Sequence, residues 1–188
     1  MNIAIFASGS GTNAENIIKY FQNSSSIKVK LILSNKKDAY VLERARKLNT
    51  ESIFLKKEDL DNPEILLSLL KLHRIDWIVL AGYLKLIPSF LIKAFPNKII
   101  NIHPALLPKF GGKGMYGMHV HEAVVENKER KTGITVHYVN ENYDEGNIIA
   151  QAECLVDEND TAQDVADKIH ILEMNHFPAI IDKLLTTL

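Results

Sequence analysis

Short runs of aliphatic and β-branched residues alternate with longer helical patterns through the first 103 residues of this chain. The runs predicted as strands are residues 3–7, 29–33, 52–55, 77–81 and 99–103, and the helices predicted between them are residues 13–22, 39–48, 63–73 and 88–95. Strand, helix and parallel strand form the repeating unit of α/β proteins. The alternation therefore predicts a doubly wound, mostly parallel sheet.

The second half of the chain follows a different pattern. A glycine-rich stretch, residues 110–117, precedes a short predicted helix at residues 122–127. Two β-rich runs, residues 133–140 and 147–156, are separated by a polar turn, which predicts an antiparallel hairpin added to the sheet. The last segment, residues 161–185, is predicted as a long final helix that begins after a threonine N-cap.

Composition limits the classes of protein that this chain can belong to. The 188 residues suit a single domain, the net charge is −1, and 46% of the residues are hydrophobic, as in ordinary globular proteins. Cys154 is the only cysteine, which excludes an internal disulfide and favours a reducing, cytoplasmic setting. We expect no nucleic acid or membrane partner, and a monomer or a homodimer.

Residues 8–14 join the first predicted strand directly to the first predicted helix. Free backbone N–H groups and the helix dipole favour an anion at such a position, so the loop predicts a phosphate site, although glycines also serve a plain tight turn. Gly9, Gly11 and Ala14 match the spacing of a dinucleotide-binding loop. However, the second strand ends at Asn35 and not at an acidic residue, and no Walker lysine follows, which favours a phosphorylated small metabolite.

Asn101 and His103 end the fifth predicted strand. Because residues two apart point to the same side of a strand, these side chains are expected to be neighbours. An amide and an imidazole at the carboxyl end of a parallel strand are suited to stabilise an oxyanion and to move a proton. A lone histidine would more often be a hydrogen-bonded core residue, but this pair predicts a catalytic site.

The turn at residues 140–146 is dense in carboxylates. Its alternating polar residues resemble an EF-hand, but Glu145 and Gln151 stand where calcium loops need a glycine and a bidentate glutamate. Taken alone, the sequence of the turn fits a solvent-exposed hairpin loop equally well. His137, on the strand before it, is a candidate for lining the site.

His119 and His121 are candidate ligands of a metal ion. Histidines two apart can bind one ion, but no neighbouring residue supplies a third ligand, and His121 with Glu122 fits the start of the next helix equally well. We therefore expect no metal.

Three segments together, residues 8–13, 100–110 and 136–149, resemble the phosphoribosylglycinamide formyltransferases, a folate-dependent family of purine biosynthesis. The similarity spans nearly the whole chain and includes residues 80–87. It implies a Rossmann-like formyltransferase fold, with a phosphate-binding half at residues 1–100 and a catalytic and folate-binding half at residues 101–188. The implied co-substrate is 10-formyltetrahydrofolate, without a metal.

The resemblance also implies roles for individual residues. The catalytic residues of the family fall on Asn101, His103 and Asp144. Those that hold the ribose phosphate and ribose of the glycinamide substrate fall on Gly11, Thr12, Asn13 and Glu173. The folate-binding residues are expected to be Lys57, Leu84, Lys85, Leu86, Ile87 and Asn101.

The chemistry implied is direct formyl transfer through a tetrahedral intermediate, with Asn101 and a protonated His103 facing its oxyanion. Asp144, if close to His103, is expected to raise the pKa of the imidazole and to assist proton transfer. Related tRNA-dependent and hydrolytic formyl enzymes carry an extra domain, for which 188 residues leave no room. The family's commoner form has a shorter loop than residues 110–117, so no residue of that loop is assigned a role.

Overall fold

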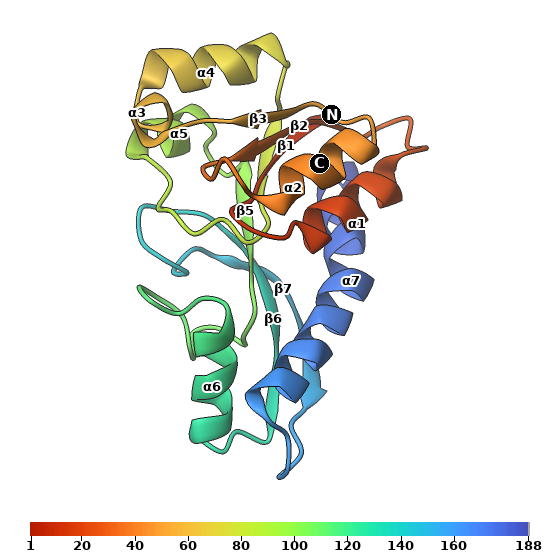
Figure 1. Cartoon of the computed structure of the whole chain (residues 1–188), viewed down its shortest axis with the longest axis vertical. Coiled ribbons are helices and arrows are strands. Elements are labelled where there is room, and N and C mark those ends of the chain that lie inside the picture. Colours follow the sequence, from red (N-terminus) through yellow and green to blue (C-terminus); the bar gives the residue numbers. More distant parts are fainter. Residues whose placement is uncertain (188) are drawn as a thin grey trace.

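The computed structural model describes residues 1–187 and contains one sheet with helices packed around it (Figure 1). The strands are β1 (Asn2–Phe6), β2 (Lys28–Ser34), β3 (Ser52–Phe54), β4 (Trp77–Leu80), β5 (Ile99–His103), β6 (Lys131–Tyr138) and β7 (Ile148–Leu155). The helices are α1 (Thr12–Phe21), α2 (Tyr40–Lys47), α3 (Lys57–Leu60), α4 (Pro63–Leu72), α5 (Ser89–Ala94), α6 (Met118–Glu126) and α7 (Ala162–Thr186).

The strands lie in the order β3-β2-β1-β4-β5-β6-β7. The first five are parallel, whereas β6 pairs antiparallel with both β5 and β7. The strand order reverses between β1 and β4, where open α/β sheets form a crevice at their carboxyl ends. The predicted doubly wound sheet with an antiparallel hairpin is confirmed.

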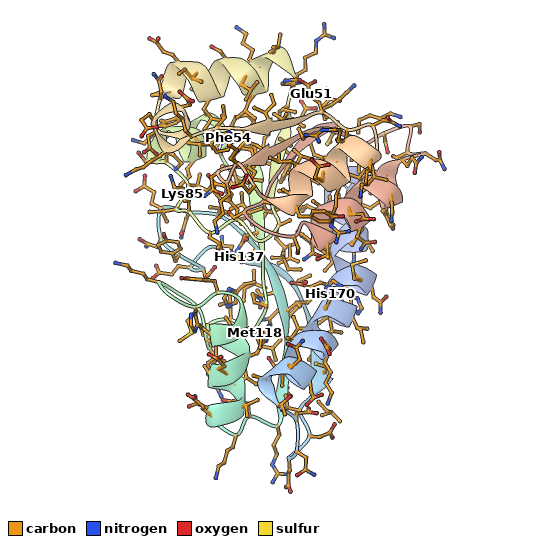
Figure 2. The ribbon with its side chains drawn as sticks, in the orientation of Figure 1. Glu51, Phe54, Lys85, Met118, His137 and His170 are labelled. Carbon is orange, nitrogen blue, oxygen red and sulfur yellow. The ribbon has the colours of Figure 1, made fainter. Side chains whose placement is uncertain are left out.

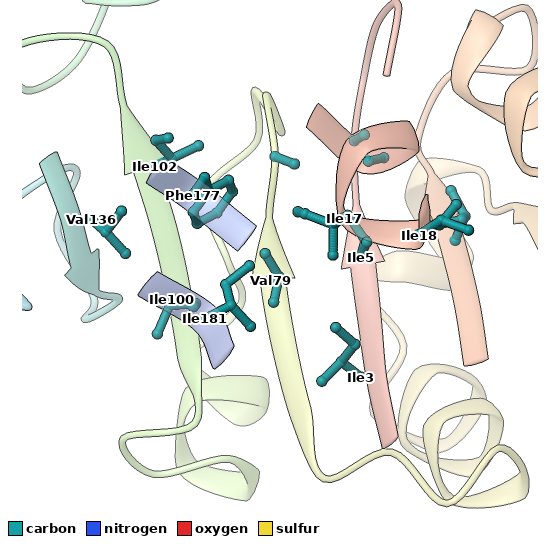
Figure 3. Close-up of a cluster of buried hydrophobic side chains, with 14 of the residues drawn as sticks. Ile3, Ile5, Ile17, Ile18, Val79, Ile100, Ile102, Val136, Phe177 and Ile181 are labelled. Atoms are coloured by element: carbon teal, nitrogen blue, oxygen red, sulfur yellow. The ribbon is translucent and has the colours of Figure 1, made fainter. Parts of the chain in front are cut away.

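The sheet is buried on both faces because its central strands are apolar on both sides. In β1, Ile3 and Ile5 belong to one core cluster, whereas Ala4 and Phe6 belong to the other. The first cluster joins the sheet to α1, α2, α6 and α7, and the second joins it to α3, α4 and α5. Figure 3 shows the first cluster, in which Phe177 of α7 packs close to β5.

Two helices differ from the prediction. Helix α6 starts at Met118, four residues before the predicted start, and α3 was not predicted. Neither has a side-chain N-cap hydrogen bond, since α6 follows Gly117 and α3 follows Lys56. The usual polar signal for a helix start is therefore missing from both.

The long final helix is confirmed. Thr161 and Asp164 form a capping box, in which each side chain accepts a hydrogen bond from the other residue's backbone N–H. The helix buries a stripe that includes Ile169, Phe177 and Ile181, while Pro178 lies inside the helix. Within residues 1–187, no helix is both long enough and apolar enough to cross a membrane.

Two isoleucines of α7 provide a test of this packing. Ile181 is fully buried against the sheet, whereas Ile171 is 58% exposed. We predict that Ile181→Ala lowers the free energy of unfolding by about 2–5 kcal/mol, because it leaves a cavity. Ile171→Ala should cost less than about 0.5 kcal/mol. Chemical denaturation of both variants measures the difference, and equal losses would contradict the described orientation of α7.

Candidate active site

A cavity of about 730 Å³ opens at the carboxyl ends of β1, β4 and β5. Its wall is formed by the loop that opens α1, by residues 81–84, by the end of β5, by the glycine-rich loop and by one side of α7. Figure 2 shows His170, which lines the cavity, on α7, and Met118 at the start of α6. The position agrees with the crevice expected for an open α/β sheet.

The loop after β1 has the geometry of an anion cradle. Helix α1 starts at Thr12, and its N-cap, Gly11, has a φ of 78°, which favours glycine. A Cβ atom on Gly11 would lie 2.4 Å from Cγ2 of Val41, so α2 packs directly against the loop. No side chain caps α1, which leaves its first N–H groups free for a ligand.

Glu173 approaches this cradle from α7. Asn13 Nδ2 donates a hydrogen bond to Glu173 Oε2 at 2.9 Å, and both residues line the cavity. Burial raises the pKa of Glu173, while the hydrogen bond from Asn13 and the nearby His170 offset part of this effect. The structure therefore brings together Gly11, Thr12, Asn13 and Glu173, the four residues expected to hold the acceptor.

Asn101, His103 and Asp144 also come together. In the register of β5 and β6, Asn101 lies opposite His137. Asp144 Oδ1 lies 3.4 Å from Asn101 Nδ2, and its Oδ2 lies 3.5 Å from His103 Nδ1. Asn101 and His103 are thus confirmed as neighbours, and the acidic turn folds back over both of them.

The glycine-rich loop holds the carboxylate of Asp144 in place. The backbone N–H of Gly112 donates to Asp144 Oδ2 at 3.0 Å. Burial is the largest single influence on the pKa of Asp144 and raises it. The nearby His137 and His103 rings and the hydrogen bond from the N–H of Gly112 together outweigh burial, so the net pKa is lowered. Asp144 is therefore ionised at neutral pH.

Asp144 raises the pKa of His103 as expected, but the net pKa is lowered, so the expectation of a protonated His103 is wrong. Its side chain is only 4% exposed, and burial lowers the pKa more than Asp144 and the carbonyl of Phe110 raise it. His103 Nε2 lies 2.7 Å from the Phe110 carbonyl oxygen, which can only accept, so Nε2 carries the proton. His103 is neutral in the resting protein, and its Nδ1 faces Asp144 and is free to accept a proton.

His137 has a role that its position in the sequence did not reveal. Its Nδ1 lies 2.8 Å from the Tyr138 carbonyl oxygen and must donate, so its Nε2 accepts from Asn101 Nδ2 at 3.1 Å. His137 is not part of the cavity wall, because it lies behind Asn101. It orients the amide group of Asn101, which no pattern of residue spacing could predict.

The expected folate residues are not all gathered in the cavity. Leu84 lines it, but Lys85, Leu86 and Ile87 do not. Leu86 is 45% exposed, whereas Ile87 is buried in the second core cluster. Lys57 is exposed at the start of α3 and also lies outside the cavity wall. The roles of these residues in folate binding stay predictions.

The two histidines near the start of α6 have different surroundings. His121 is buried and lines the cavity, whereas His119 is largely exposed and lies 3.4 Å from Glu122. Burial is the main reason why the pKa of His121 is lowered. Among residues 1–187, no group of three or more His, Cys, Asp or Glu side chains is arranged to hold a metal ion.

The fold and the site together define a class of protein. Residues 1–181 match the model of the family described as Formyl transferase, and the chain belongs to this family. It is 37% identical, over 97% of its length and 93% of the relative's, to phosphoribosylglycinamide formyltransferase of Bacillus subtilis strain 168. It is 44% identical over 89% of its length to the chloroplastic phosphoribosylglycinamide formyltransferase of Arabidopsis thaliana.

Solved structures agree with these matches. The crystal structure of phosphoribosylglycinamide formyltransferase from Bacillus halodurans superposes with a TM-score of 0.87 at 38% identity, covering 98% of this chain and 95% of that one. The corresponding structure from Anaplasma phagocytophilum gives a TM-score of 0.90 at 31% identity, with coverages of 99% and 87%. The chain spans only 59% and 60% of the length of the plant relatives from Arabidopsis thaliana and Vigna unguiculata.

The protonation of His103 can be tested directly. We predict that its NMR titration midpoint lies below the ordinary value of 6.5. Asp144→Asn should lower the midpoint further, because the charge of Asp144 favours the protonated ring.

The signal of His103 is assigned by its loss in His103→Gln. The control is Asp167→Asn, because Asp167 is exposed on α7 and its substitution should leave the midpoint unchanged. A midpoint above 6.5, or one that rises in Asp144→Asn, would contradict the described electrostatics.

Proposed function

We propose that this chain transfers the formyl group of 10-formyltetrahydrofolate to the amino group of phosphoribosylglycinamide, a step of purine biosynthesis. One observation carries the proposal: the carboxylate of Asp144 contacts both Asn101 and His103 in the same cavity that contains an anion cradle. The relatives named phosphoribosylglycinamide formyltransferase support it. Both substrates are small molecules, and the cytoplasmic location and monomeric or homodimeric state stay predictions.

The acceptor is assigned to the cradle end of the cavity. Gly11, Thr12 and Asn13 would hold the phosphate at the free N–H groups of α1. Glu173, already in contact with Asn13, would accept hydrogen bonds from the ribose hydroxyls. The phosphate fixes one end of the substrate, and the amine at the other end reaches the Asn101 and His103 region.

The folate is assigned to the opposite side of the cavity. Leu84, Lys85, Leu86 and Ile87 would line its pocket together with residues 140–144 and Asn101. Leu84 and Asn101 are at the cavity wall, which supports this placement. Lys57 remains the candidate for the glutamate tail. In this proposal, residues 1–100 provide the phosphate site, and residues 101–188 provide the catalytic residues and part of the folate site.

The reaction needs three events that these side chains can perform. The amine nitrogen attacks the formyl carbon, and the carbonyl oxygen becomes an oxyanion that needs hydrogen-bond donors. One amide hydrogen of Asn101 is held by His137, and the other, now donated to Asp144 at 3.4 Å, would turn to the oxyanion. His103 would accept the proton of the attacking amine at Nδ1, where Asp144 stabilises the imidazolium. The bond between the formyl carbon and N10 of the folate then breaks as the proton taken up by His103 passes to N10, and the carbonyl of the product re-forms. No step of this mechanism requires a metal.

A formyl-transfer assay tests the function. The purified chain is supplied with 10-formyltetrahydrofolate and with phosphoribosylglycinamide, a nucleotide amino-sugar, or water alone as acceptor. Turnover that depends on phosphoribosylglycinamide is the expected result. Folate release without an acceptor would instead identify a hydrolase, turnover only with the amino-sugar would identify a different acceptor, and no turnover with any of them would overturn the proposal.

The role of Asp144 gives a separate prediction. Asp144→Asn keeps the shape of the side chain but removes the charge that stabilises protonated His103. We predict that kcat falls by about 10²- to 10⁴-fold, while the Kd of each substrate changes little. Steady-state kinetics and calorimetry measure the two effects, with Asp167→Asn as the matched control. A kcat close to that of the wild type would remove Asp144 from the mechanism.

A further inference from the structure

Ser8 lies where the two proposed substrate sites separate. Strands β1 and β4 run parallel, and their pairing continues beyond the strands, since the N–H of Ala81 donates to Phe6 and the N–H of Ser8 donates to Gly82. After Ser8, the segment that follows β1 enters the anion cradle. After Gly82, which has a φ of 71°, the segment that follows β4 changes direction and leads to the residues assigned to the folate.

The hydroxyl of Ser8 connects the two diverging segments. It donates to Asn35 Oδ1 at 2.6 Å and accepts from the backbone N–H of Leu84 at 3.0 Å. Ser8 is 2% exposed, so water does not compete for these contacts. Because a hydroxyl has one hydrogen, which Asn35 takes, Ser8 has no donor left for a substrate phosphate. Its place at the cavity wall therefore does not make it a phosphate ligand.

Asn35 determines which way the hydroxyl points. It follows the end of β2 and is half-buried, and its Oδ1 fixes the hydrogen of Ser8. A lone pair of the hydroxyl is then directed at the N–H of Leu84. The segments that follow three neighbouring strands, β2, β1 and β4, thus each contribute one group to this chain of hydrogen bonds.

We propose that Ser8 is a positioning residue that fixes the folate segment relative to the anion cradle. The inference rests on the proposed function, because the cradle would hold one reactant and the Leu84 segment the other. The rate of a reaction between two bound molecules depends steeply on their separation and alignment. The hydroxyl of Ser8 extends the backbone link between Ser8 and Gly82 to Leu84, and so fixes the position of the segment beyond Gly82.

Ser8→Ala tests the proposal. The variant keeps every proposed substrate contact but loses the link, so Kd values for phosphoribosylglycinamide alone and for an unreactive folate analogue alone should stay within about threefold of the wild type. The single-turnover rate with both substrates saturating should fall by about 10- to 100-fold. A serine with a merely structural role would lower the melting temperature without this selective loss of rate.

A pair of substitutions at Asn35 provides a second test that does not depend on the stability of Ser8→Ala. Asn35→Asp keeps an acceptor oxygen for the Ser8 hydroxyl, whereas Asn35→Leu has a similar size and no acceptor. The single-turnover rate of Asn35→Asp should stay within about threefold of the wild type. That of Asn35→Leu should fall by about three- to 30-fold, because the hydroxyl is then free to rotate.

Several results would overturn the proposal. One is a rate for folded Ser8→Ala within threefold of the wild type, and another is weaker binding of one substrate with an unchanged rate. Equal rates for Asn35→Asp and Asn35→Leu would also overturn it. If the wild type transfers formyl groups but the variants behave in these ways, only the role of Ser8 fails. A wild type without transfer overturns the proposed function and the role of Ser8 with it.

Discussion

The buried carboxylate of Asp144 is the group around which the site is organised. A carboxylate loses several kcal/mol of hydration when it leaves water, so it stays ionised only where donors and positive charge replace the water. The carboxylate of Asp144 accepts hydrogen bonds from Gly112 and Asn101, and the rings of His103 and His137 lie 3.5 Å and 3.6 Å from it. These residues come from three separate segments of the chain. The glycine-rich loop, β5 and β6 must therefore all be in place before the carboxylate can be accommodated.

The sheet provides that arrangement through its topology. Parallel strands bring their carboxyl ends to one edge, so the cradle after β1 and the Asn–His pair of β5 open into the same cavity. The acidic turn, which connects β6 and β7 of the antiparallel hairpin, lies at the same edge of the sheet. Asp144, which follows His103 by 41 positions in the sequence, becomes its neighbour in this way.

Local patterns in the sequence predicted most of the fold. Apolar periodicity gave the strands and the longer helices, and the threonine cap located the start of α7. The side-by-side placement of Asn101 and His103 followed from the alternation of side chains in a strand. Each of these depends on residues that are close in sequence.

The parts that the sequence did not predict depend on contacts across the fold. The lowered pKa of His103 results from burial in the folded protein, and burial is not visible in a short motif. The donor role of His137 Nδ1 depends on where the Tyr138 carbonyl points. The start of α6 was misplaced because Gly117 gives the helix no polar cap.

The loop after Pro108 has two parts with different contacts. Phe110 and Gly112 contact His103 and Asp144 through backbone atoms, while the Phe110 ring packs against the first core cluster and Gly112 has a φ of 94°, which favours glycine. Within this loop, the hydrogen bonds to His103 and Asp144 come from Phe110 and Gly112 and not from residues 113–117. One loop therefore has two separate tasks: its first part holds two largely buried polar side chains, and residues 113–117 form part of the cavity wall.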